Sequence, residues 1–184
     1  MNLKEFTENY SKHLNVARDL FVEKLKEYGA SYLLFRPESL TDQVANKAHR
    51  IVTIQKKNGM QKVYTPEDTI YLEYVGIINY SLIALSPKVN LSNINKLTDS
   101  DIAEIIYAYD FAASECFDLL MNKNDDYGNS WQLMRATSYI DMILVKLNRI
   151  KRLEDIGQSE EKIRDNYLDI VNYAMFALIK IPAG

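Results

Sequence analysis

The chain contains two related segments, and this internal repeat constrains the fold more than any other sequence feature. Tyr28-Gly29-Ala30-Ser31-Tyr32 and Tyr127-Gly128-Asn129-Ser130-Trp131 open parallel passages. Identical residues recur at an offset of 99 positions from Asp19 and Asp118 onward, and the match continues at an offset of 93 as far as Leu85 and Leu178. The sequence therefore predicts a tandem duplication of a three-helix unit, a covalent pseudo-dimer.

Hydrophobic residues in both segments recur at spacings of three and four, the period of an amphipathic helix, and no stretch alternates convincingly as a strand would. The spacing predicts an all-α bundle of two fused three-helix repeats. Capping patterns place helix starts at Ser39, Thr65, Thr98, Ser138 and about Ser159, and Gly29 is expected to end the first helix in a left-handed conformation. The expected helices cover about 3–26, then 39 to the polar loop that begins at Lys56, then 65 to just before Pro87, then 98 to at least Leu120, and finally 138–155 and 159–180.

The predicted boundaries are residues 1–87 for the first repeat, 88–97 for a linker rich in Asn and Ser, and 98–184 for the second repeat. A unit of about 90 residues buries little surface alone, so we expect the two repeats to share one apolar interior.

Composition narrows the classes of function. A hydrophobic content of 47% and a charged content of 26% are typical of a soluble globular protein. The net charge of −3 gives no reason to expect duplex nucleic acid as a partner, and no apolar run is long enough for a membrane span. The single cysteine, Cys116, cannot form an internal disulfide, and the amino terminus lacks an apolar signal region. Cytoplasm is the expected compartment, and a homo-oligomer is left open.

The last predicted helix carries a column of acidic residues. Glu161, Asp165, Asp169 and Asn172 are spaced 4, 4 and 3 residues apart, which places them within about 80° of arc on a helix. Stacked carboxylates repel one another, and a hard cation such as Mg²⁺ or Mn²⁺ would remove that repulsion. The alternative, which spacing alone favours, is a helix face turned toward solvent.

The preceding helix carries basic residues that can bind phosphate. Arg149 and Arg152 share a face with Asp141, Lys146 flanks them, and Arg135 lies just ahead of the helix. Asp141 also stands three residues after Ser138, where it can act in a capping box. For the basic residues, ion pairing with the acidic column is an equally good interpretation.

Tyr127 and Trp131 flank the repeated glycine turn. Trp131 can stack on a base or fill the space between the repeats, and its match to Tyr32 in the other copy favours a core position.

Three motifs of the second repeat resemble the bacterial and phage family called nucleotide modification-associated domain 1. They are Lys123-x-x-Asp126-Tyr127-Gly128-x-Ser130-Trp131, then Asp141-x4-Lys146-x2-Arg149-Ile150, and finally Glu161-x3-Asp165-x3-Asp169-x2-Asn172-Tyr173. More distantly, the pattern resembles the MazG-like nucleoside triphosphate pyrophosphohydrolases, all-α enzymes that hold magnesium with acids from two helices.

The resemblance implies a catalytic, magnesium-binding set of Glu161, Asp165 and Asp169, with Glu115 and Asp118 as the nearest candidates for the second acidic helix. It also implies triphosphate contacts from Lys146 and Arg149. Arg135, Asn172, Tyr127 and Trp131 complete the predicted substrate-binding set.

Asp68, Leu72 and Gly76 replace the acidic residues in the first repeat, so we expect one site per chain, built mainly by the second repeat. The expected function is binding of a nucleotide, extending to magnesium-dependent hydrolysis of a nucleoside triphosphate. The alternative is a non-catalytic helical interaction module associated with nucleotide or DNA modification. Whether the chain is an enzyme is open at this point.

Overall fold

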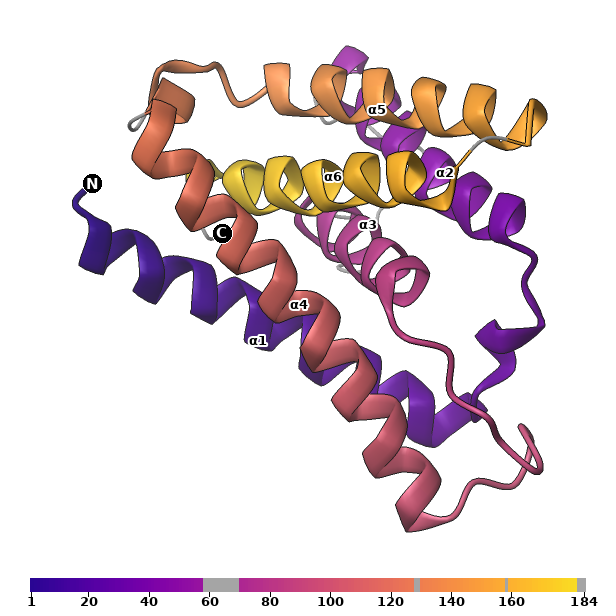
Figure 1. The fold of residues 1–184 in the computed structure, drawn as a ribbon. Coiled ribbons are helices and arrows are strands. Elements are labelled where there is room, and N and C mark those ends of the chain that lie inside the picture. The colour runs from indigo at the N-terminus through magenta and orange to yellow at the C-terminus, as the bar shows by residue number, and fades with distance from the viewer. Residues whose placement is uncertain (58–69, 128–129, 158, 182–184) are drawn as a thin grey trace.

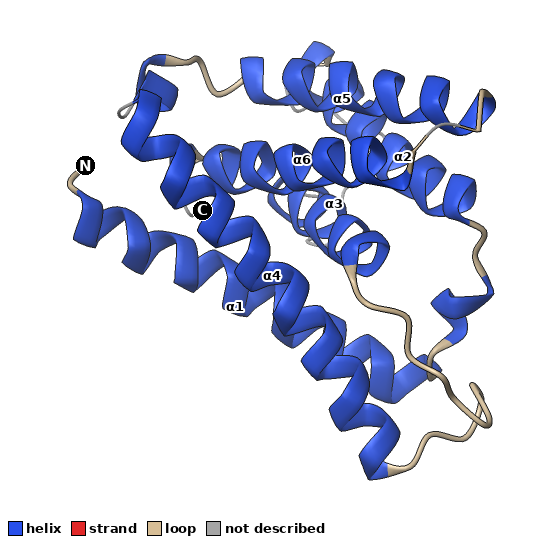
Figure 2. Ribbon diagram, viewed as in Figure 1, coloured by secondary structure: helices blue, strands red, loops and turns tan. Residues whose placement is uncertain are grey.

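The structure is a computed structural model that describes residues 1–57, 70–127, 130–157 and 159–181, without the side chains of 124–127. Figure 1 shows an all-α bundle, and Figure 2 shows helices joined by loops with no strand among the described residues. The predicted fold class is therefore confirmed. In the described part of the chain, none of the helices combines the length and the apolar character that a bilayer span requires.

The same order of elements occurs twice along the chain. A long helix is followed by a short 3₁₀ helix and then by two further helices. The first set is α1 (Leu3–Tyr28), η1 (Ser31–Leu34), α2 (Pro37–Lys56) and α3 (Ile70–Leu85). The second set is α4 (Asp99–Tyr127), η3 (Ser130–Leu133), α5 (Ser138–Asp155) and α6 (Glu160–Lys180).

Two of the predicted helix caps are confirmed. At the start of α4 the backbone N–H of Thr98 donates to Asp101 at 2.8 Å, and the Asp101 N–H donates to the Thr98 hydroxyl at 3.2 Å. This reciprocal pair is a capping box. At the start of α6 the Ser159 hydroxyl accepts from the Lys162 N–H at 3.4 Å.

Two other predicted caps are wrong. Helix α2 begins at Pro37 because the fixed φ of proline suits the first helical position, so Ser39 lies inside the first turn. Helix α5 does begin at Ser138 as predicted, but the capping box of Ser138 and Asp141 does not form, because Thr137 precedes the helix and makes no side-chain cap bond. The predicted start at Thr65 lies outside the described residues.

Helices α3 and α6 form the centre of the bundle. They pack against each other, α1 and α4 each contact both of them, and α2 and α5 cover them on another side (Figure 1). The second half of α6 is buried on nearly every face, from Tyr167 to Leu178. The buried hydrophobic residues form one cluster to which both repeats contribute.

The long helices α1 and α4 contact each other through aromatic rings and an ion pair. Phe21 stacks on Tyr109 with ring centroids 4.4 Å apart, and Arg18 donates to Asp110 at 2.7 Å. Charged and aromatic contacts therefore join the first helix of one repeat to the first helix of the other.

Gly29 makes the turn between α1 and η1 possible. Its φ of 65° is a conformation that residues with a side chain rarely adopt. A Cβ at this position would lie 2.9 Å from the Ile94 carbonyl oxygen. That oxygen accepts from the Ala30 N–H at 3.2 Å, so the segment between the repeats lies directly against this turn.

Trp131 lies in the core, as its match to Tyr32 favoured. Its side chain is 7% exposed and stacks on Phe176, with centroids 4.6 Å apart and an interplanar angle of 7°. Phe6 contacts the same ring at 5.3 Å. The prediction that Trp131 contacts substrate is corrected here, because neighbouring core rings cover its indole.

Candidate functional site

An open pocket of about 340 Å³ lies between the C-terminal half of α5 and the N-terminal half of α6. The two helices run side by side at this point (Figure 1). Four residues of α5 or the turn after it, Arg149, Arg152, Leu153 and Ile156, line the pocket together with three residues of α6, Lys162, Asp165 and Asn166. The pocket thus brings two predicted site residues, Arg149 and Asp165, to one place.

The pocket carries an excess of positive charge. Arg149, Arg152 and Lys162 line it against the single carboxylate of Asp165, and none of the three cations has an ion-pair partner within the described ranges. The first turns of α6 add the positive end of a helix dipole. An anion is therefore the ligand that the electrostatics of the pocket favour.

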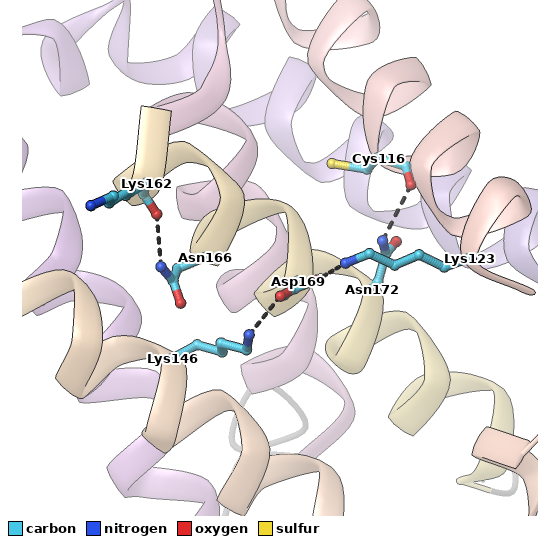
Figure 3. A network of polar contacts seen from close by, with 7 residues as sticks. All are labelled: Cys116, Lys123, Lys146, Lys162, Asn166, Asp169 and Asn172. Atoms are coloured by element: carbon cyan, nitrogen blue, oxygen red, sulfur yellow. Dashed lines mark hydrogen bonds and ion pairs between the residues drawn. The ribbon is translucent and has the colours of Figure 1, made fainter. Parts of the chain in front are cut away.

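Asp169, one turn beyond Asp165, is engaged by two lysines (Figure 3). Lys123 of α4 and Lys146 of α5 each donate to its carboxylate at 2.6 Å, and its side chain is 18% exposed. Burial alone would raise the pKa of Asp169, but the hydrogen bonds from the two lysines outweigh it and hold the pKa below its ordinary value. Asp169 is therefore an ionised carboxylate that joins three helices.

The rest of the acidic column runs from solvent into the core. Glu161 and Asp165 are exposed, which agrees with the solvent-facing interpretation for these two residues. Asn172 is buried, and its side-chain amide donates to the Cys116 carbonyl at 3.3 Å (Figure 3). The column changes environment because the second half of α6 is the central helix of the bundle.

The candidate second acidic pair, Glu115 and Asp118, does not join the column. Glu115 forms an ion pair with Arg164, and Asp118 is exposed. Among the described residues, no three or more His, Cys, Asp or Glu side chains form a group that could hold a metal ion. The expected protein-only magnesium centre of Glu161, Asp165, Asp169, Glu115 and Asp118 is therefore not assembled there, since arginine or lysine partners hold two of these acids.

The predicted basic residues divide into three groups. Arg149 lines the pocket, Lys146 lies one helical turn before it on α5 and is ion-paired with Asp169, and Arg135 is exposed ahead of α5 and does not line the pocket. The ion-pairing interpretation therefore holds for Lys146. The side chain of Tyr127 lies outside the described part.

Sequence reasoning did not place Lys162 and Asn166 in the site, whereas it did include Arg152 among the basic residues that can bind phosphate. Lys162 follows Glu161 and was overlooked beside the acidic column. Asn166 had a detectable signal, because its match at the 93-residue offset is the charged residue Glu73. An exchange of a carboxylate for an amide between repeats marks a change of electrostatic role.

In the first repeat, Glu73 neutralises the basic residues of α2. Its side chain is 2% exposed, with one carboxylate oxygen 3.2 Å from Lys47 Nζ and the other 3.2 Å from Arg50 Nη1. Gly76 stands at the position of Asp169, and the Lys47 side chain passes directly over it, 3.2 Å from where a Cβ would be. Lys47, which matches Lys146, therefore pairs with Glu73, which lies one helical turn before the position equivalent to Asp169.

The family model described as nucleotide modification associated domain 1 matches residues 24–86 and 123–181, one segment in each repeat. Comparison with curated proteins gives no match, and neither does comparison with solved structures.

Proposed function

The chain belongs to the nucleotide modification associated domain 1 family, and from this premise we propose that it binds a nucleotide in the pocket between α5 and α6. The observation that carries the proposal is the group of three cations, Arg149, Arg152 and Lys162, that line the pocket without ion-pair partners among the described residues. A group of cations beside an open pocket suits the phosphates of a nucleotide.

The chemistry of the lining suits both ends of a nucleotide. Each arginine can donate two parallel hydrogen bonds to a phosphate, while Lys162 supplies a point charge near the start of α6. Leu153 and Ile156 provide apolar surface against which a base or sugar can pack. The pocket volume of about 340 Å³ is at the small end of the range for ligand sites, roughly 300–1,000 Å³.

Magnesium fits this proposal as an ion that arrives with the nucleotide. Mg²⁺ is commonly bound by one or two carboxylates together with substrate phosphates and water, and Asp165 is the carboxylate that lines the pocket. When bound, the ion neutralises phosphate charge and polarises a phosphoryl oxygen. Magnesium-dependent hydrolysis of a nucleoside triphosphate is thus the second candidate function. It is favoured by the position of the Asp165 carboxylate in the lining of the pocket.

A binding assay tests the proposal directly. Titration calorimetry with deoxynucleoside mono- and triphosphates, with and without Mg²⁺, should detect binding by the wild-type chain. Arg149→Met and Arg152→Met should each weaken it by about tenfold or more, since a hydrogen bond to a charged group is worth about 1.5–3 kcal/mol.

Arg135→Met is the matched control, because Arg135 is an exposed arginine that does not line the pocket. It should leave affinity unchanged. If no nucleotide binds to the wild type, or if all three variants bind equally well, the proposed site is wrong.

Pyrophosphate release distinguishes the two candidate functions. An enzyme should release pyrophosphate from a deoxynucleoside triphosphate in the presence of Mg²⁺ and lose that activity in Asp165→Asn, while a binding module should bind without turnover. Binding that persists in Asp165→Asn would separate the role of the carboxylate from that of the cations.

A further inference from the structure

We infer that one phosphate of the ligand lies between Lys146 and Arg149, beside Asn166, at the position that the Glu73 carboxylate occupies in the first repeat. The inference rests on the proposed function and adds the location of the anion and the residue that keeps its place open. The comparison between the two repeats supplies the argument.

The first repeat shows how this pair of cations holds an anion. Lys47 and Arg50 stand three residues apart on α2, and both reach Glu73 on α3 at 3.2 Å. The carboxylate is 2% exposed, while the side chains of Lys47 and Arg50 are 33% and 42% exposed. Two cations one turn apart on one helix therefore enclose a small oxyanion against the neighbouring helix.

The second repeat keeps the cations and lacks the anion. Lys146 and Arg149 match Lys47 and Arg50, but Asn166 replaces Glu73. The Asn166 amide donates to the Lys162 carbonyl of its own helix at 2.7 Å (Figure 3). Arg149 and Asn166 both line the pocket. The place filled by a carboxylate in one repeat is thus bordered by a neutral amide and an open pocket in the other.

Asp169 explains how Lys146 is stabilised when the site holds no ligand. Its counterpart in the first repeat is Gly76, which has no carboxylate to offer Lys47. In the second repeat, Lys146 can instead pair with Asp169, one turn beyond Asn166 on α6. Lys123 also contacts Asp169 at 2.6 Å, so the carboxylate keeps a cationic partner when Lys146 turns toward a phosphate. A bound phosphate can therefore pair with Lys146 while Asp169 remains paired with Lys123.

Restoring the internal carboxylate is the first test. Asn166→Glu should form an ion pair with Arg149 and weaken binding of a deoxynucleoside triphosphate by about tenfold or more. Asn166→Gln, which adds the same length without charge, is the matched comparison and should weaken binding clearly less than Asn166→Glu does. Equal affinity in wild type and Asn166→Glu would overturn the inference.

Removing the carboxylate from the first repeat is the second test, and it cannot be explained by added negative charge. Glu73→Asn and the near-isosteric Glu73→Gln should each acquire a response to inorganic phosphate, seen as a rise in melting temperature with phosphate concentration that exceeds the rise in wild type. Adding Arg50→Met to either variant should abolish the excess.

The two tests separate this inference from the proposed function. Nucleotide binding by wild type, with no excess phosphate response in either Glu73 variant, overturns the inference and leaves the pocket proposal standing. An excess phosphate response in the Glu73 variants, with no nucleotide binding by wild type, supports the anion position and overturns the proposed function.

Discussion

Asp169 joins three helices beside the pocket, because its carboxylate accepts from Lys123 on α4 and Lys146 on α5. We predict that Asp169→Asn lowers the free energy of unfolding at neutral pH by about 1–3 kcal/mol, as expected for lost hydrogen bonds to charged groups. Urea unfolding followed by circular dichroism measures the change.

The loss should depend on pH in a direction fixed by the pKa of Asp169. The folded-state pKa lies below the unfolded value of about 3.9, so the unfolded chain takes up the proton more readily. The ion pairs therefore stabilise the protein fully above about pH 5, and their contribution is lost as the pH falls through the folded-state pKa. The difference in stability between wild type and Asp169→Asn should shrink as the pH falls below the unfolded-state pKa of about 3.9.

Asp165→Asn is the matched control, because Asp165 is an exposed carboxylate one turn earlier on the same helix. It should change stability by no more than about 0.5 kcal/mol. A difference between Asp169→Asn and wild type that stays constant from pH 7 to pH 3 would show that the ion pairs are not its cause.

The sequence predicted which side chains share a helix face better than it predicted their partners. Spacing alone identified Arg149 and Asp165, which line the pocket. It could not show that Lys123, 46 residues earlier in the chain, contacts Asp169, because that contact depends on how α4 packs against α6. The magnesium set failed for the same reason, since the ion pair between Arg164 and Glu115 joins two different helices.

At the scale of elements, the turn after α1 depends on Gly29. We predict that Gly29→Ala lowers the free energy of unfolding by about 2–4 kcal/mol, since a side chain is strained at positive φ and its Cβ would also meet the Ile94 oxygen at 2.9 Å. Gly157→Ala is the control, because Gly157 has a φ of 61° with no atom within 4 Å of the added Cβ.

Gly157→Ala should therefore show only the backbone cost, about 1–2 kcal/mol. Thermal unfolding of both variants beside wild type gives the comparison. If the two substitutions cost the same, contact with the segment between the repeats adds nothing to the requirement for glycine at position 29.

Helix starts were predictable where no competing signal lay nearby. The Thr98 and Ser159 caps form as expected. Ser39 does not cap α2, because Pro37 lies two residues earlier and can begin the helix itself. Helix α5 begins at Ser138 as expected, but Ser138 is its first residue and not its cap, since Thr137 takes the position before the helix. Local patterns thus predicted where helices lie more reliably than which side chains cap them.

For the whole molecule, the buried residues of the two repeats belong to one cluster, so we expect each repeat to need the other in order to fold. We predict that residues 98–184 expressed alone lack a cooperative thermal transition, since α6 would lose its contacts with α1 and α3. Circular dichroism melting of the fragment, and of its mixture with residues 1–87, tests this.

The mixture should regain cooperative unfolding if the missing contacts are the cause. A fragment 98–184 that melts cooperatively as a monomer would contradict the prediction and make each repeat an independent domain. Sequence comparison revealed the duplication itself, because both copies retain the residues that end helices and fill the core. It could not reveal how the copies pack, since that is decided by contacts between them.

The burial pattern of α6 has a mechanical consequence for ligand selection. Its second half is clamped inside the bundle, and its first half projects to the surface with Lys162, Asp165 and Asn166. Packing of the buried half fixes the direction of α6, while the exposed half carries the side chains that line the pocket. Substitutions at Lys162, Asp165 or Asn166 can therefore change which ligand is bound without disturbing the packing of the buried half of α6.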